Sequence, residues 1–224
     1  MTMSDVSITR AATIDLIRSR PRLKSTLKRV LEVVGYDTTD WVRVVMYQRC
    51  FEHLRKMKPE ALDALEISAG PHWKRAVPFR SFTGTSYPAF DVCHEQLPSQ
   101  YDVIIADQIF EHLEWPLRAA KNVYEMLRPG GTFVIATPFL LRYHASPIDC
   151  SRWTERGLSH LLQEAGFPAD HIKTDAWGNR ACVKANFKRW AKRGFFGSLR
   201  NEPDFPVMVW AFAQRPLTEP SRTN

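Results

Sequence analysis

The chain has 224 residues, of which 44% are hydrophobic, and 31 basic against 24 acidic side chains give it a formal net charge of +7. This is enough apolar sequence for one substantial core, and the basic excess suits either an anionic partner or a solvated basic surface. The sequence contains no Cys-x-x-Cys pair, no signal peptide and no apolar run near the roughly 18 residues of a membrane span, so we expect a cytoplasmic protein without a disulfide framework.

The N-terminal part of the chain is expected to be helical. Apolar residues recur at helical spacing over residues 11–34. Pro21 should break this pattern, and Gly35 should end it. Asp40 is then expected to cap a second helix over Trp41–Lys56.

From Ala64 onward, short apolar segments alternate with helical patterns. The extended segments are, in chain order, ALEIS, FRSFTGTS, YPAFDVC, YDVIIAD, TFVIATP, HIKTDAWG and FPVMVWAFA. Helices are predicted before the "RPGG" turn and after the expected cap Thr154, the latter ending at Gly166. This alternation favours an α/β fold with a doubly wound, mostly parallel, seven-stranded Rossmann-like sheet.

We therefore divide the chain into three parts: an N-terminal helical segment (1–60), the main α/β domain (61–215) and a flexible tail (216–224). Ligands of doubly wound sheets bind at the carboxyl ends of the strands. The loops that follow the predicted strands are consequently where functional residues are expected.

These loops carry several motifs in a fixed order. They are "LEISAGPHW", "FDVCHEQLP", "ADQIFEHL", "LRPGG" and "RWTERGLSHLLQEAGF". In this order they resemble the class I S-adenosylmethionine (SAM)-dependent methyltransferases, and more narrowly the small-molecule branch of methyltransferase type 11. The resemblance implies a Rossmann-like fold, SAM as the cofactor and methyl transfer as the activity.

The resemblance assigns the first group of cofactor-binding residues. Glu66 matches the acid at the end of the first strand, and Gly70 matches the middle glycine of the Gly-x-Gly-x-Gly turn. Ser68 and His72 stand where the family has glycines, and serine suits a close approach only if its φ stays negative. Ser86 stands where an acid usually binds the ribose hydroxyls. The alternative is an ordinary tight turn.

The second group follows the third and fourth extended segments. Asp91 matches the acid that receives the adenine amino group, unless it only caps its own turn. Asp107 and Gln108 would flank the methionine part of SAM, where a carboxylate favours the sulfonium charge. Glu111 suits a helix N-terminus, and His112 is either a general base or a packed histidine.

The segment "TPFLLRYHASPIDCSRWT" follows the fifth strand and should face the acceptor of the methyl group. His144 is the first candidate base, because imidazole titrates near neutral pH, and Asp149 would orient it. Four further residues are predicted to bind an anionic or sugar-like acceptor: Arg142, Tyr143, Arg152 and Trp153. The alternative is a lid with a surface histidine. No metal site is predicted.

Residues 184–200 interleave basic and aromatic side chains. This pattern suits a membrane surface, a lipid-linked acceptor or a nucleic acid. The alternative is a solvated helix whose aromatic side chains pack on the core.

The predicted function is therefore O-methylation of a sugar, a glycolipid or another small metabolite. We expect a small-molecule or glycan- or lipid-linked acceptor, with peripheral membrane contact through 184–200. A binding module with a degenerate methyltransferase fold is the alternative, since two motif glycines and the ribose acid are replaced. Nucleic-acid methylation is disfavoured, because "ADQI" does not resemble Asn/Asp-Pro-Pro-Tyr and Cys150 lacks a preceding proline.

Overall fold

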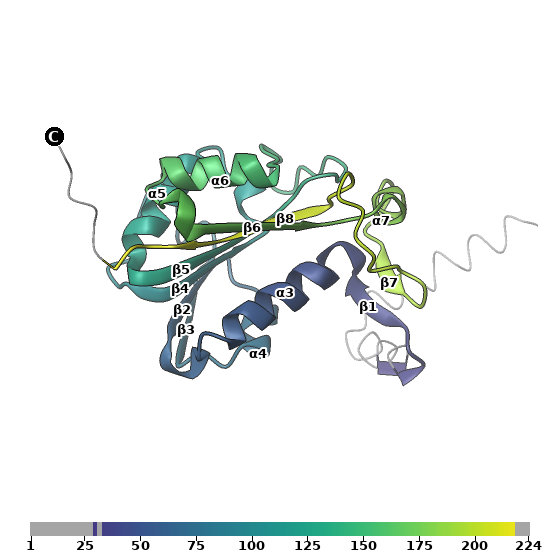
Figure 1. The fold of residues 1–224 in the computed structure, drawn as a ribbon, viewed down its shortest axis with the longest axis horizontal. Helices are drawn as coiled ribbons and strands as arrows, with labels where there is room; N and C mark the ends of the chain where they lie inside the picture. The colour runs from purple at the N-terminus through teal and green to yellow at the C-terminus, as the bar shows by residue number, and fades with distance from the viewer. Residues whose placement is uncertain (1–28, 31–32, 218–224) are drawn as a thin grey trace, which may run out of the picture.

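The computed structural model describes residues 29–30 and 33–217 (Figure 1). Most of the helix predicted over residues 11–34, including Pro21, lies outside these residues, as does the tail from residue 218 onward. Gly35 has a φ of +83°, the left-handed conformation that ends helices.

The main sheet has six strands within the described part of the chain. Their spatial order is β3 (Ser81–Gly84), β2 (Asp63–Ile67), β4 (Tyr101–Asp107), β5 (Leu127–Pro138), β8 (Met208–Gln214) and β6 (Ile172–Trp177). Strands β3, β2, β4 and β5 are parallel, whereas β8 runs antiparallel to β5 and to β6. The predicted class, a mostly parallel doubly wound sheet, is confirmed.

The expected seventh strand does not form. The segment YPAFDVC lies in turns between β3 and β4, although Phe90, Val92 and Cys93 are buried there. Pro88 cannot donate a ladder hydrogen bond, and the Asp91 side chain accepts a local turn hydrogen bond from the backbone N–H of Cys93. The apolar side chains of this segment therefore fill the core from a turn.

Both faces of the sheet are covered (Figure 1). Helices α5 (Pro116–Met126) and α6 (Glu155–Glu164) cover one face, and α3 (Val44–Arg55) and α4 (Pro71–Ala76) cover the other. Along β4, Ile104 packs with the α5 and α6 side, while Val103 and Ile105 pack with the α3 side. The continuous apolar run of this strand thus reflects burial on both faces.

Asp40 does not cap the helix that follows it. The chain passes through a 3₁₀ turn (Trp41–Arg43) into α3, and the Asp40 side chain makes no capping hydrogen bond. Its carboxylate instead lies 2.6 Å from Lys192 Nζ. The reason is a second, two-stranded sheet of β1 (Asp37–Asp40) and β7 (Lys192–Gly194), which places these residues opposite each other.

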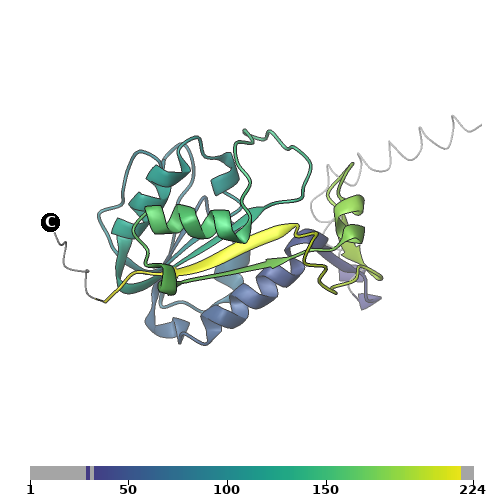
Figure 2. The ribbon, with the colours of Figure 1, turned by 45° about the horizontal axis from the view of Figure 1, so that its top comes forward.

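This small sheet and α7 (Arg180–Ala185) lie beyond one end of the main sheet (Figure 2). Helix α7 and strand β7 belong to the insertion between β6 and β8, which contains the basic and aromatic segment 184–200, whereas β1 comes from the N-terminal part of the chain. No helix in the described residues is both long enough and apolar enough to cross a membrane.

The cap predicted for α6 is confirmed. Thr154 Oγ1 accepts a hydrogen bond of 3.1 Å from the backbone N–H of Gly157, and Gly166, with a φ of +118°, follows the helix end. Leu158 and Leu162 are fully buried on its inner face. This helix fixes the far end of the loop 139–154, which we call the acceptor loop.

Candidate active site

Glu66 lies near the carboxyl end of β2, between the neighbouring strands β3 and β4. It is only 3% exposed, and its Oε2 has no hydrogen-bond partner. Burial raises the pKa of Glu66 to about 7, the Gly70 backbone N–H lowers it in part, and the nearby charge of Asp107 raises it further. The carboxylate form is therefore unfavourable until a positive group faces it.

The turn after β2 differs from expectation at Ser68. Its φ is +53°, so serine occupies the left-handed conformation that glycine favours. The N–H of Ser68 donates to Thr85 Oγ1 and that of Ala69 donates to the Thr85 carbonyl. A Cβ at Gly84 would lie 2.7 Å from the Ala69 Cβ, so this glycine allows β3 to approach the turn.

Asp107 is the last residue of β4 and lies near Glu66. Its carboxylate is held by side chains of the helical layer formed by α3 and α4. Tyr47 Oη donates to Asp107 Oδ2 at 2.7 Å and Trp73 Nε1 at 3.1 Å, while Arg43 Nη1 lies 4.0 Å away. Asp107 Oδ1 is buried without a partner. The carboxylate is thus fixed in place with one oxygen left to accept from a ligand. Glu66 and Asp107 together are called the cofactor edge below.

His72, which replaces a family glycine, contributes to the surroundings of Asp107. Its ring stacks on Tyr47, with ring centroids 5.4 Å apart. His72 therefore packs against the side chain whose hydroxyl donates to Asp107. The sequence did not reveal Arg43 or Tyr47 as site residues. Their spacing predicts that they share one side of a helix, but it does not indicate which residues that side contacts. A contact across 60 residues of sequence has no local signal.

The residues expected at the nucleoside have a mixed placement. Ser86 is exposed just beyond β3. Asp91 caps its own turn, since its Oδ1 accepts from Cys93 N and its Oδ2 lies 2.9 Å from His94 Nδ1. Gln108 follows β4 with a φ of +60°, and its Nε2 is buried without a partner. The nucleoside-binding roles of Ser86 and Asp91 stay predictions.

Glu111 and His112 form the end of a 3₁₀ turn (Phe110–His112) after β4. Glu111 is fully buried, neither carboxylate oxygen has a hydrogen-bond partner, and burial raises its pKa to about 8. His112 Nε2 lies 3.7 Å from Glu111 Oε1. On the other side of the ring, His112 Nδ1 is hydrogen-bonded to the Ile148 carbonyl.

The fold brings His144 of the acceptor loop to this pair. Its ring meets that of His112 edge to face, with centroids 5.1 Å apart, and its Nε2 is buried without a partner. Burial lowers the pKa of His144, which keeps the imidazole neutral at pH 7. Asp149 accepts from the His144 backbone N–H at 2.8 Å, so it orients the loop and not the ring.

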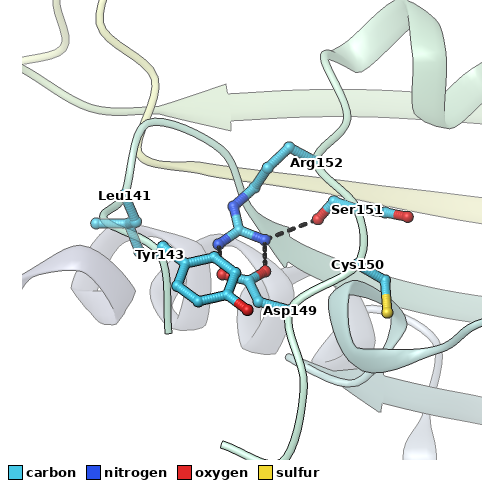
Figure 3. A pocket seen from close by; sticks show the side chains of 6 residues that line it. All are labelled: Leu141, Tyr143, Asp149, Cys150, Ser151 and Arg152. Carbon is cyan, nitrogen blue, oxygen red and sulfur yellow. Dashed lines mark hydrogen bonds and ion pairs between the residues drawn. The ribbon is translucent and has the colours of Figure 1, made fainter. Parts of the chain in front are cut away.

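A cavity of about 290 Å³ opens beside the acceptor loop (Figure 3). Its lining residues are Leu141, Tyr143, Asp149, Cys150, Ser151 and Arg152. The Arg152 guanidinium forms a two-point ion pair with the Asp149 carboxylate and also donates to the Ser151 carbonyl. Three of the predicted acceptor-loop site residues, Tyr143, Asp149 and Arg152, therefore share one cavity.

Two other predicted residues lie elsewhere. Trp153 packs against the core on the α6 side. The Arg142 guanidinium lies 5.0 Å from the ring centroid of Trp190, and the same ring is 5.4 Å from that of His144. The segment 184–200 thus reaches the acceptor loop through Trp190.

Most of the buried side-chain atoms without a hydrogen-bond partner in the described residues collect at this end of the sheet. They belong to Glu66, Asp107, Gln108, Glu111, Thr137 and His144. Buried polar atoms in folded proteins are nearly always paired. Their concentration here indicates a site whose polar groups are completed by a ligand.

The comparison with protein families agrees with this geometry. A family model described as a methyltransferase domain matches residues 10–172. The chain belongs to this methyltransferase family. SAM is its cofactor, and the resemblance drawn from the motifs is confirmed.

One curated relative is a probable SAM-dependent methyltransferase of Mycolicibacterium smegmatis. It is 28% identical over 96 residues, which cover 38% of this chain and 37% of the relative. This chain therefore matches well under half of that relative's length.

Two solved structures share the fold. Phosphoethanolamine N-methyltransferase 2 of Haemonchus contortus superposes with a TM-score of 0.50 at 11% identity, over 75% of this chain and 52% of that one. The CurJ carbon methyltransferase also gives a TM-score of 0.50, at 14% identity over 77% of this chain and 53% of that one. At these identities the likeness extends to the fold alone.

The residues at the cofactor edge fit SAM. The cofactor carries an ammonium and a sulfonium group, and Glu66 and Asp107 each offer a buried carboxylate oxygen without a partner. The nearby charge of Asp107 raises the cost of ionising Glu66, and a cationic ligand relieves that cost.

Proposed function

We propose that this methyltransferase transfers the methyl group of SAM to a hydroxyl oxygen of a sugar, a glycolipid or another small metabolite. The observation that carries the proposal is the adjacency of two incomplete sites at one sheet edge. Glu66 and Asp107 have open oxygens suited to a cation, and the acceptor loop carries a polar cavity.

SAM, when bound, supplies an electrophilic methyl group on a positively charged sulfur. The cofactor edge would hold it, with Asp107 fixed by Tyr47 and Trp73 so that its free oxygen is already oriented. Such fixed dipoles and charges need no rearrangement when the ligand arrives.

A hydroxyl acceptor must lose its proton during methyl transfer. His144 is the group that we expect to receive it, because its imidazole is neutral and its Nε2 is buried without a partner. The adjacent Glu111 and His112 place further unpaired acceptors around the same point. This arrangement supports general-base assistance at the acceptor oxygen.

The cavity supports a sugar-like acceptor over a strongly anionic one. Arg152 is neutralised by its two-point pair with Asp149, so the two side chains together carry no net charge. They still offer donors and acceptors suited to hydroxyl groups, and Tyr143 adds an aromatic face that is 73% exposed. At about 290 Å³ the cavity lies at the small end of ligand pockets.

The segment 184–200 supports presentation of the acceptor at a membrane surface. Phe187, Trp190, Phe195 and Phe196 are all exposed, the last at 94%. Two of its basic residues, Lys192 and Arg193, are paired with acids of β1. Exposed aromatic rings beside basic side chains suit a lipid headgroup region, so we include a lipid-linked sugar among the acceptors.

The experiment is an acceptor screen that measures formation of S-adenosylhomocysteine. Free sugars, glycolipids and lipid-linked sugars in vesicles are each supplied with SAM, and the methylated atom is identified by mass spectrometry and NMR. The proposal predicts a methyl ether on a sugar or related hydroxyl. Methylation at nitrogen or carbon would contradict it.

A further inference from the structure

A cluster of metal-ligating side chains lies where the 3₁₀ turn after β4 meets the acceptor loop. Glu111, His112 and His144 each offer one ligand atom, and these atoms lie within 4.8 Å of one another. They come from segments more than 30 residues apart, so only the folded chain assembles them. We propose that this cluster binds a divalent transition-metal ion.

Glu111 is the strongest reason for a cation. Its carboxylate is fully buried, and neither oxygen has a hydrogen-bond partner. A buried carboxylate without partners is costly, and proteins pair such groups or use them as metal ligands. A cation would supply the partner that both oxygens lack.

The two histidines are oriented as metal ligands are. The hydrogen bond from His112 Nδ1 to the Ile148 carbonyl assigns the proton to that nitrogen, which leaves a lone pair on Nε2 facing Glu111. A backbone carbonyl behind the ring is the usual outer partner of a metal-binding histidine. His144 contributes a buried Nε2 with no other partner.

The distances allow coordination with little movement. Metal bonds of about 2.0–2.2 Å require donor atoms roughly 3–3.5 Å apart, and His112 Nε2 already lies 3.7 Å from Glu111 Oε1. All three donor atoms lie within 4.8 Å of one another, so small side-chain and loop adjustments bring them to coordination distance. One carboxylate and two imidazoles favour ions such as Zn²⁺, Mn²⁺ or Co²⁺ over Mg²⁺ and Ca²⁺, which prefer oxygen ligands.

Three protein ligands leave coordination positions open, and the polar cavity adjoins them. The Glu111 carbonyl accepts from the backbone N–H groups of Cys150 and Ser151, both of which line the cavity. A metal ion lowers the pKa of an oxygen that it binds, so an acceptor hydroxyl is a suitable occupant. This role rests on the proposed function and changes His144 from proton acceptor to ligand, since one lone pair cannot serve both.

The test is a titration of tag-free protein, freed of metals by a chelator, with Co²⁺ followed by visible absorption and Zn²⁺ followed by calorimetry. We expect one ion per chain. The variants E111Q and H144A should bind it at least about 100-fold more weakly, because loss of a ligand exceeds the loss known for outer partners. The matched control H160A removes an exposed histidine of α6 and should bind as the wild type does.

Three outcomes would overturn the inference: no binding by the wild type, equal binding by E111Q, or an intense cobalt–thiolate band that points to Cys150. Circular dichroism shows whether each variant is folded. An increase in the wild-type unfolding temperature with Zn²⁺, absent in folded E111Q, provides an independent readout. Calorimetry with SAM on the same samples separates the two proposals. A protein that binds SAM but binds neither Co²⁺ nor Zn²⁺ refutes only the metal site.

Discussion

Asp107 and Asp149 are both carboxylates at the candidate site, but their surroundings differ. Both oxygens of Asp149 are used by Arg152 and the His144 backbone N–H. Asp107 has three neighbouring donors at one oxygen and none at the other. The Asp149–Arg152 pair is therefore electrostatically complete without a ligand, whereas the cofactor edge is completed by one. This difference predicts that cofactor binding depends on charge and that acceptor binding depends on shape and hydroxyl contacts.

The largest expected effect separates the two regions by function. H144A should reduce turnover by roughly 10²–10⁴-fold, the usual contribution of a group that assists proton removal. Its affinity for SAM should stay at the wild-type value, because His144 belongs to the acceptor loop. The rate of S-adenosylhomocysteine formation measures turnover, and calorimetry measures SAM affinity. A large loss of SAM affinity would show that His144 also contributes to cofactor binding.

A smaller loss is expected from D107N at the cofactor edge. Hydrogen bonds to charged groups contribute about 1.5–3 kcal/mol, so SAM affinity should fall by about 10–100-fold. D102N is the matched control, because Asp102 lies in the same strand but pairs with Arg128 away from the site. Calorimetry should show weak binding only for D107N, and equal weakening by both variants would indicate a general effect on the sheet.

The raised pKa of Glu66 predicts a pH dependence of about tenfold or less. SAM binding should tighten as the pH rises through about 7, where this carboxyl loses its proton. Without SAM, the folded chain holds a proton that the unfolded chain, with a pKa of 4.5, has lost. The stability of the free protein should therefore fall as the pH rises from 4.5 to about 7.

E66Q provides the comparison for both measurements. It should bind SAM more weakly above pH 7 without the pH dependence. Its unfolding temperature should fall less than that of the wild type as the pH rises to about 7, because only the buried Glu111 carboxyl, with a pKa of about 8, still contributes to the fall. Parallel pH profiles for the two proteins would mean that Glu66 does not titrate in this range.

The smallest effect concerns the turn that follows β2. Ser68 has a φ of +53°, so S68G should relieve strain of about 1 kcal/mol, offset in part by the greater entropy of glycine in the unfolded chain. A69G gains only the entropy and should destabilise the protein. Urea unfolding measures the change in the free energy of unfolding for each variant. This change should be an increase for S68G and a decrease for A69G.

Part of the fold and of the candidate site could be predicted from the sequence. The strands that hold Glu66 and Asp107 follow from their apolar residues, and the cap at Thr154 follows from its side chain. The pairing of β1 with β7, the hydrogen bond from Tyr47 to Asp107 and the meeting of Glu111 with His144 depend on tertiary packing. Asp40 was predicted wrongly because its long-range contact with Lys192 outweighed the local capping preference, and YPAFDVC because Pro88 and the Asp91 turn oppose a strand locally.

Glu66 and Asp107 are the residues at which we expect SAM to bind. Calorimetric titration of the purified wild-type chain with SAM, and with S-adenosylhomocysteine beside it, measures this binding. We predict micromolar binding at one site per chain. An absence of binding at millimolar concentrations would mean that these carboxylates do not form a SAM site, and would favour a methyltransferase fold retained as a binding module.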